Sequence, residues 1–451
     1  MSDKVAKVGE ISKIAIPAVL ESVVSVIVTT VDTKMLSVLG KQAVSAVSFT
    51  SQPKLIVFAL FFALGTTTAI YVAQALGRKD RDGANAVFHL ILKVTIALSL
   101  VLGILCWLFA DPIMHVCNLQ ADTVGMSITF FRIVMLFMVF QNVSVILNAA
   151  LRGVGQTRVP LVAGIALAGV DVVVNYLLIE GHMGFPRLEV AGDAIATVAG
   201  TVGACLVSGT YLLFKSDFLT LKGLFSFEGQ DRQLLAEVSS KASKVVSENL
   251  LTRVGFLLSS IIVSTLSSAE TAVYSVAMIL LNYSFAFGDG LQSAAVTLVG
   301  RNMGAGDTES LRGYARLIQA MGVIVAGILS VVYVAGSSWF FGQYFPDSAS
   351  IELGVKFSYM AAILTFLQIP RIVDVGIMRG GGDVRTPMIL ASVSVFLVNP
   401  GVSYLLVAIM SLGIWGVWGG SLVSQSLWLI GAVVKTRQLL GSLGTKRATD
   451  T

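Results

Sequence analysis

Charged residues are scarce in this chain of 451 residues. Aspartate, glutamate, lysine and arginine make up 13% of it, against about 25% in soluble globular proteins, whereas apolar residues make up 55%. This balance excludes an ordinary soluble domain and indicates a membrane protein. The net charge of +5 does not indicate nucleic-acid binding, because the basic residues are spread over short loops and form no basic face interleaved with aromatic residues.

Cysteine and histidine are equally rare, with three of each. Cys106, Cys117 and Cys205 have neither metal-ligand spacing nor an evident pairing, so we expect them to pack between helices. The histidines lie in separate segments, and no Gly-x-Ser-x-Gly nucleophile elbow occurs. We therefore expect no metal site, no cofactor and no enzymatic activity. No signal peptide is evident, so the first apolar span is expected to direct membrane insertion.

Long apolar stretches dominate the rest of the chain. A helix needs about 20 apolar residues to cross the hydrocarbon core of a bilayer. Twelve stretches meet this length: 14–38, 51–75, 86–110, 125–150, 159–180, 191–214, 241–266, 271–299, 313–335, 353–378, 388–410 and 413–435. They predict an all-α membrane protein of twelve transmembrane helices, with lobes at residues 1–222 and 241–436, a cytoplasmic linker at 223–240 and a cytoplasmic tail at 437–451.

The two halves repeat each other at a fixed spacing. Gly77 and Asp80 recur as Gly304 and Asp307, and the Arg-Gly-rich segment 152–160 recurs as 379–387, so both motifs share one offset in the numbering (304 − 77 = 379 − 152 = 227). A parallel repeat of two six-helix lobes is typical of secondary transporters with a site between the halves. The glycine-rich turns are expected to be tight helix connections, because glycine readily adopts positive φ.

Basic residues concentrate in both tails and in alternate loops, such as 78–81 and 215–232. Lysine and arginine in short loops are retained on the cytoplasmic side of the membrane. We therefore expect both termini to be cytoplasmic, in a plasma (inner) membrane.

Ionisable residues inside a span are candidates for function, because each costs about 2.5–3.5 kcal/mol at the helix centre. Asp32 lies among hydroxyl residues in the first span, and its alternative role is an interfacial carboxylate paired with Lys34 or Lys41. Asp171 and Asn175 share one face of the fifth helix, since they stand at positions i and i+4.

The sixth span adds a further polar residue, Thr197, to this set. Asp32, Asp171, Asn175 and Thr197 are predicted to bind one proton or one Na⁺. Asp193, near the start of the sixth helix, is expected to be a hydrated charge at the end of a loop.

The second half has its own polar residues within spans. Glu248 follows Glu21 at the spacing of the repeat, so both copies carry a carboxylate in their first helix. A second-lobe site is predicted from Glu248, Asp289, Gln368, Arg371 and Asp374. The alternative is that Arg253 and Arg371 neutralise the acids in purely structural ion pairs.

Several motifs in order resemble the multidrug and toxic compound extrusion (MATE) transporters. They are Val31-Asp-Thr33, Leu151-Arg-Gly-Val-Gly-Gln-Thr-Arg158, Val190-Ala-Gly-Asp-Ala-Ile-Ala-Thr197 and Met378-Arg-Gly-Gly-Gly-Asp383. By position, Asp32, Thr197 and Glu248 match site residues of that family. The resemblance implies two lobes around a central cleft and export of organic, often cationic, compounds in exchange for H⁺ or, less favoured, Na⁺. The chain departs from the family in reading Asp171-x-x-x-Asn175 where Asn-x-x-x-Asp or Asn-x-x-x-Asn is usual.

Two other functions remain open. A lipid-linked saccharide flippase on a related plan would need a cationic cavity for pyrophosphate, for which Arg253, Arg371, Lys93 and Arg132 are available. A receptor or non-transporting scaffold is disfavoured by the duplication. The hypothesis is a monomeric antiporter whose lobes rock as Asp32 and Asp171 gain and lose a proton.

Overall fold

The structure, a computed structural model, describes residues 2–117, 123–224 and 232–449. In these parts the chain is helical and forms no β-strand. It divides into two compact units. We call residues Leu20–Ala242 the first lobe, and residues up to Val19 together with those from Ser243 onward the second lobe.

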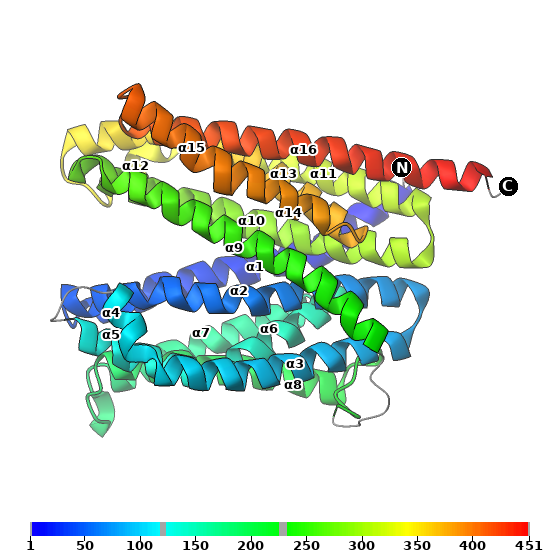
Figure 1. The fold of residues 1–451 in the computed structure, drawn as a ribbon, viewed down its shortest axis with the longest axis horizontal. Coiled ribbons are helices and arrows are strands. Elements are labelled where there is room, and N and C mark those ends of the chain that lie inside the picture. Colours follow the sequence, from blue (N-terminus) through cyan, green and yellow to red (C-terminus); the bar gives the residue numbers. More distant parts are fainter. Residues whose placement is uncertain (1, 118–122, 225–231, 450–451) are drawn as a thin grey trace. The chain divides into compact units, whose positions relative to one another are not determined.

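The first half of the chain supplies nine helical segments in the described ranges (Figure 1). They are α1 (Ser2–Ser37), α2 (Lys41–Arg78), α3 (Arg81–Leu108), α4 (Ala110–Cys117), α5 (Val124–Leu136), α6 (Met138–Gly153), α7 (Arg158–Leu178), the 3₁₀ turn η1 (His182–Gly184) and α8 (Val190–Phe214). The core of the first lobe lies between α2, α3, α5 and α6, where Phe61, Phe88 and Phe131 are fully buried.

The second half continues with longer helices (Figure 1). They are α9 (Arg232–Ser264), α10 (Ser268–Ala305), α11 (Thr308–Ala335), α12 (Ser337–Gly342), α13 (Ser348–Gly380), α14 (Arg385–Ala391), the π-helical η2 (Ser392–Val398), α15 (Asn399–Tyr404), the π-helical η3 (Leu405–Ile409) and α16 (Ile414–Thr449). In the second lobe, α13 packs along α10 and α11, so most of its second half is buried.

The predicted membrane spans are present. Within the described residues, eleven helices are long and apolar enough to cross a bilayer, and α5 and α6 together make a twelfth with a bend of 50° between them. The prediction of an all-α membrane protein is confirmed. The bend and the short helices α4 and α12 were not expected, because the length of an apolar stretch does not report where a helix breaks.

The repeat is visible in the backbone of the glycine-rich turns. Gly155 after α6 and Gly382 after α13 both have positive φ, 82° and 90°. In each turn the glycine N–H donates to the carbonyl oxygen of the preceding arginine, Arg152 or Arg379, at 2.9 Å. These segments are tight helix connections, as expected.

Two helices contribute to both lobes. The first part of α1 packs in the core of the second lobe, where Glu10 forms an ion pair with Arg301 at 2.8 Å. The first part of α9 packs in the core of the first lobe, where the Lys241 ammonium lies 4.1 Å from the ring centroid of Tyr71. The boundary between the two compact units therefore lies within α1 and within α9, whereas the sequence predicts a linker between the lobes at residues 223–240. Each initial segment buries its apolar side chains against helices of the other repeat.

The eleventh predicted span, 388–410, alternates between α-helical and π-helical segments. Pro400 has no N–H to donate, and π-helical turns lie on both sides of the short α15 that contains it. Here α9 comes close, since a Cβ on Gly255 would lie 2.3 Å from the carbonyl oxygen of Val395. This irregular region carries Asn399, one of the residues that line the cavity described below.

Candidate functional site

The first feature of the site region is an ion pair that occurs once in each lobe. Glu21 of α1 pairs with Arg152 of α6 at 2.8 Å, and Glu248 of α9 pairs with Arg379 of α13 at 2.9 Å. Both members of the second pair follow those of the first at the spacing of the repeat. The side chains of the second pair are 6% and 10% exposed, against 17% and 27% in the first. The spacing of the repeat indicates the two glutamates but not their partners.

The predicted first-lobe residues Asp32, Asp171 and Asn175 meet in one cluster. The Asn175 amide nitrogen lies 3.4 Å from Asp32 Oδ1 and 3.3 Å from Asp171 Oδ2. The two carboxyl groups are within hydrogen-bonding reach of each other. Asp171 and Asn175 are buried, while Asp32 is partly exposed. The sequence therefore predicted correctly that these three side chains come together from two distant helices.

The alternative partners of Asp32 are not used. In the described part of the chain, Asp32 forms no salt bridge with Lys34 or Lys41. The neighbouring hydroxyls serve the helix itself, since Thr33 Oγ1 donates to the carbonyl oxygen of Thr29 at 2.8 Å. Thr197 is half-buried on α8, and its hydroxyl makes no hydrogen bond with any described residue. It remains a predicted member of the site without a contact to the other three.

The sequence analysis was wrong about Asp193. It is 2% exposed instead of hydrated. The start of α8 packs tightly on α7, because a Cβ on Gly192 would lie only 2.7 Å from the carbonyl oxygen of Leu178. Asp193 is held there within hydrogen-bonding reach of the Asn175 amide, and it interacts electrostatically with Asp32.

A lysine that the sequence analysis did not single out completes this cluster. Lys54 of α2 interacts electrostatically with Asp193, and its ammonium lies 4.6 Å from the ring centroid of Phe130. A charged residue inside the predicted span 51–75 was the available signal. We call Asp32, Lys54, Asp171, Asn175 and Asp193 the first-lobe cluster; it contains three carboxyl groups and one ammonium.

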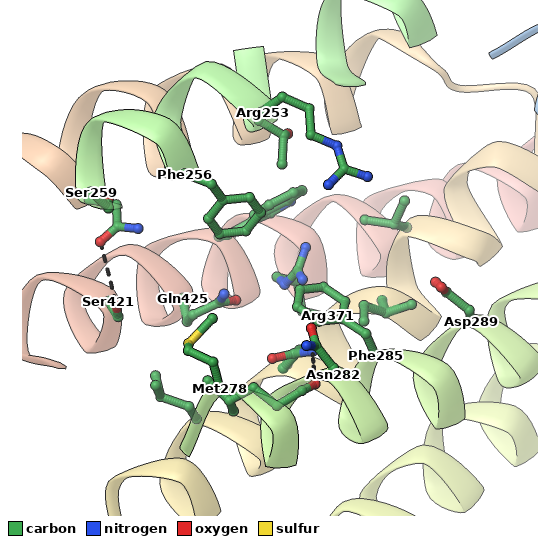
Figure 2. A pocket seen from close by; sticks show the side chains of 18 of the residues that line it. Arg253, Phe256, Ser259, Met278, Asn282, Phe285, Asp289, Arg371, Ser421 and Gln425 are labelled. Carbon is green, nitrogen blue, oxygen red and sulfur yellow. Dashed lines mark hydrogen bonds between the residues drawn. The ribbon is translucent and has the colours of Figure 1, made fainter. Parts of the chain in front are cut away.

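The second-lobe residues surround a cavity of about 680 Å³ between α9, α10, α13, α15 and α16 (Figure 2). Four of the five predicted residues line it: Glu248, Asp289, Gln368 and Arg371. Asp374 does not, because its carboxylate accepts a hydrogen bond from Gln319 of α11 at 2.6 Å. The helix turn between Arg371 and Asp374 directs the acid to a different neighbour.

For Glu248, the structure shows a different partner from the Arg253 or Arg371 of the structural alternative. Glu248 pairs with Arg379, which the sequence analysis treated as part of a turn. Within the described residues, neither Arg253 nor Arg371 makes a salt bridge or a hydrogen bond. Arg371 instead stacks on Trp428, with its guanidinium carbon 3.8 Å from the ring centroid. The cavity thus contains cationic groups that the protein itself does not pair.

A family model described as MatE matches this chain twice, over residues 17–177 and 245–405, which together exceed half of its length. The starts and the ends of the two matches are separated by nearly the spacing of the repeat. The double match agrees with the duplication seen in the backbone.

Among curated relatives, the probable multidrug resistance protein NorM of Thermotoga maritima is 24% identical over 91% of this chain and 88% of its own length. The multidrug resistance protein PmpM of Pseudomonas aeruginosa is 22% identical over 85% and 81%. A solved structure of a multidrug resistance MATE family transporter in an outward-facing conformation has the same fold, with a TM-score of 0.89, 19% identity and coverage of 97% of this chain and 96% of that one. The chain therefore belongs to the MatE family and is a multi-pass membrane transporter of the MATE type.

Proposed function

We propose that the protein is a multidrug efflux antiporter that exports small organic compounds in exchange for H⁺. The relatives named above as multidrug resistance proteins support the export of drugs. The observation that carries proton coupling is the contact between the carboxyl groups of Asp32 and Asp171. Two ionised carboxylates can only accept hydrogen bonds and repel each other, so their closeness favours a proton on one of them.

The composition of the first-lobe cluster favours a proton over Na⁺. An amide N–H of Asn175 points at both Asp32 and Asp171, at 3.4 and 3.3 Å, and so occupies acceptor positions that a metal cation would need. Lys54 already provides a fixed positive charge opposite Asp193. A proton can be added to such a cluster without assembling a shell of oxygen ligands.

Helix α1 is the element through which protonation can act on the lobes. It carries Asp32 in the first lobe and Glu10, bound to Arg301, in the second. Pro17 lies inside this helix, just before the point at which the chain passes from one lobe to the other. A proline removes one hydrogen bond from the helix interior and permits a kink there. A change of charge at Asp32 would thus bias the bend of α1 and the state that holds the drug.

In this proposal the protein acts as a monomer in an inner membrane, with both termini in the cytoplasm. Organic cations are attracted by the carboxyl groups of the first-lobe cluster. The rocking of the lobes exposes the site to each side in turn.

The test is transport in proteoliposomes under separately imposed H⁺ and Na⁺ gradients, with ethidium as the substrate. We expect efflux driven by H⁺ and lost in Asp32→Asn. The matched control is Asp111→Asn, which removes a half-exposed carboxylate paired with Arg132 and outside the cluster. Efflux driven by Na⁺ with Asp32→Asn still active would overturn proton coupling in the first lobe and move attention to Glu248. No efflux under either gradient would contradict the export of drugs.

A further inference from the structure

The second-lobe cavity contains a buried guanidinium that lacks an anionic partner. Arg371 is 4% exposed, yet within the described residues it makes no salt bridge and no hydrogen bond. Its stacking on Trp428 covers one face of the guanidinium plane and leaves the N–H groups at the edge unpaired. Burying a charge without pairing it is costly, so such a residue in a cavity indicates a missing counter-charge.

A second guanidinium in the same cavity is also unpaired. Arg253 of α9 lines the cavity and, in the part of the chain that the structure describes, forms neither a salt bridge nor a hydrogen bond. Figure 2 shows the side chains of Arg253 and Arg371 reaching into the cavity from two different helices, α9 and α13. They can therefore approach one ligand from two directions.

The charges of the lining residues do not cancel. Three guanidinium groups, of Arg253, Arg371 and Arg379, face two carboxylates, of Glu248 and Asp289. Glu248 is engaged by Arg379 at 2.9 Å, and both carboxylates act on Arg371 only through their electrostatic field. The lining residues thus carry one positive charge in excess, which a ligand with a single negative charge would neutralise.

Among the arginine and neutral side chains that line the cavity, buried N–H donors without a hydrogen-bond partner outnumber acceptor oxygens without one. Arg371 Nε, Arg379 Nε, Trp418 Nε1 and Trp428 Nε1 are buried donors without a hydrogen-bond partner, whereas Gln425 Oε1 is such an acceptor. Buried polar groups are nearly always satisfied, so this excess of N–H groups describes a complementary ligand rich in acceptor oxygens. A carboxylate has two acceptor oxygens and binds guanidinium groups through charge-assisted hydrogen bonds.

The rest of the lining combines neutral polar side chains, such as Asn282 and Gln425, with aromatic and thioether side chains. Phe256, Met278 and Phe285 line the cavity (Figure 2). Tyr274 and the two tryptophans also belong to its lining. Such side chains bind flat ring systems by stacking and adapt to varied shapes. The volume of about 680 Å³ lies within the range of about 300–1,000 Å³ that holds drug-sized ligands. It suits a compact aromatic compound better than a lipid-linked saccharide.

We propose that this cavity is a binding site for aromatic carboxylates, whose negative group is held by Arg253 and Arg371 while the ring lies among the aromatic side chains. The proposal rests on the proposed function in one respect, that a bound carboxylate is a transported substrate. It also assigns the two lobes opposite preferences: the first-lobe cluster attracts cations, and the second-lobe cavity attracts monovalent organic anions.

The test measures binding by the purified full-length protein in detergent, without any ion gradient. Isothermal titration calorimetry would compare 1-naphthoate, 1-naphthylmethanol and 1-naphthylmethylammonium, which share one ring system and differ in charge. Hydrogen bonds to charged groups contribute about 1.5–3 kcal/mol, so naphthoate should bind about tenfold or more tightly than the alcohol. The ammonium compound should bind no more tightly than the alcohol in this cavity.

Substitutions locate the site. Arg253→Gln and Arg371→Met should each weaken naphthoate binding about tenfold or more, while the alcohol binds as before. Arg371→Lys should recover part of the loss, because it keeps the charge but not the planar fork. Arg132→Gln removes a guanidinium from the first lobe and is the matched control that should change nothing. If Arg371→Met fails to fold, Arg253→Gln still decides, because Arg253 is exposed and forms no salt bridge or hydrogen bond within the described residues.

Three results would overturn the proposal: naphthoate that binds no better than the alcohol, affinity unchanged in both arginine variants, or inorganic pyrophosphate that binds more tightly than naphthoate and displaces it. The last result would point to a diphosphate ligand and to the flippase function. Failure of drug efflux leaves these binding results intact. Conversely, proton-driven efflux by a protein that does not bind naphthoate would refute this inference alone.

Discussion

Replacing Glu248 by glutamine should destabilise the protein more than the same change at Glu21. Each glutamate forms an ion pair with an arginine, and the two pairs occupy equivalent positions of the repeat. The chain thus contains its own matched control, in which chemistry and topology are the same and burial differs. Glu248→Gln leaves the charge of Arg379 inside the second lobe, where the arginine side chain is 10% exposed.

The expected magnitudes follow from burial. Removing one partner of a buried ion pair costs about 3–5 kcal/mol, because the other charge stays behind without compensation. The cavity beside Arg379 and the side-chain oxygen of Gln292, 3.4 Å from it, relieve part of this cost, so we expect about 3 kcal/mol. Exposed pairs contribute about 0–1 kcal/mol, and the intermediate exposure of the Glu21 pair places Glu21→Gln at about 1–2 kcal/mol.

The assay is the apparent unfolding temperature in detergent, followed by tryptophan fluorescence at one fixed heating rate. A change of about 1 kcal/mol shifts the midpoint of a domain of this size by about 2–4 °C, so Glu248→Gln should lower it by about 6–12 °C. The double variant Glu248→Gln with Arg379→Gln should recover much of the loss, because no charge is then left unpaired. Equal effects of Glu21→Gln and Glu248→Gln, or strictly additive effects in the double variant, would refute the reasoning.

Three further predictions concern stability and use the same assay. Lys79, at the end of α2, has a φ of 58°, and its counterpart in the repeat, Gly306, has a φ of 70°. Since glycine adopts positive φ without strain, Lys79→Gly should stabilise the protein by about 0.5–1 kcal/mol, and Gly306→Ala should destabilise it by about 1 kcal/mol. Effects of the same sign would contradict this reasoning. Asp307 caps α11 by accepting a hydrogen bond from the backbone of Ser310, which holds the pKa of its carboxyl below the ordinary value; Asp307→Ala should cost about 1 kcal/mol at neutral pH. Because that pKa is lowered on folding, the contribution is complete above the ordinary pKa of about 3.9 and disappears as the pH falls through the lowered value. A loss that stays constant throughout acid titration would exclude the cap. Asp193→Asn should destabilise by about 1–3 kcal/mol because the residue is buried and interacts electrostatically with Lys54. A change within about 0.5 kcal/mol would indicate the hydrated position first expected from the sequence.

The spans could be predicted from the sequence because each depends on a local property, the length of an apolar stretch. The bend between α5 and α6 and the π-helical turns around α15 depend instead on which helices pack against those segments. The passage of α1 and α9 from one lobe to the other has the same origin, since it is decided by contacts between residues far apart in the chain, such as Glu10 and Arg301. The local sequence pattern does not predict such contacts.

The candidate site was predictable to the extent that helix geometry determines it. Asp171 and Asn175 had to share a face of α7, and their meeting with Asp32 required only that α1 pack beside them. Asp193 was misjudged because closeness to the start of a helix was equated with contact with water. The depth at which a helix starts depends on its packing, and α8 starts in close contact with α7.

Comparison of the two copies of the repeat distinguishes residues that build the fold from residues of the candidate sites. Residues that build the fold recur at its fixed spacing, as Glu21 and Arg152 do in Glu248 and Arg379, and the structure pairs them in the same way in both lobes. Apart from Glu248 and Arg379, the charged residues of the two candidate sites do not recur: the position equivalent to Asp32 holds a serine in the second half, and that equivalent to Arg371 holds a serine in the first. Both copies have the same helices and the same structural ion pair. Folding of a copy therefore does not require a carboxyl group at the position of Asp32 or a guanidinium at the position of Arg371. We therefore explain these two charged side chains, which the equivalent positions of the other copy lack, by what they bind inside the membrane.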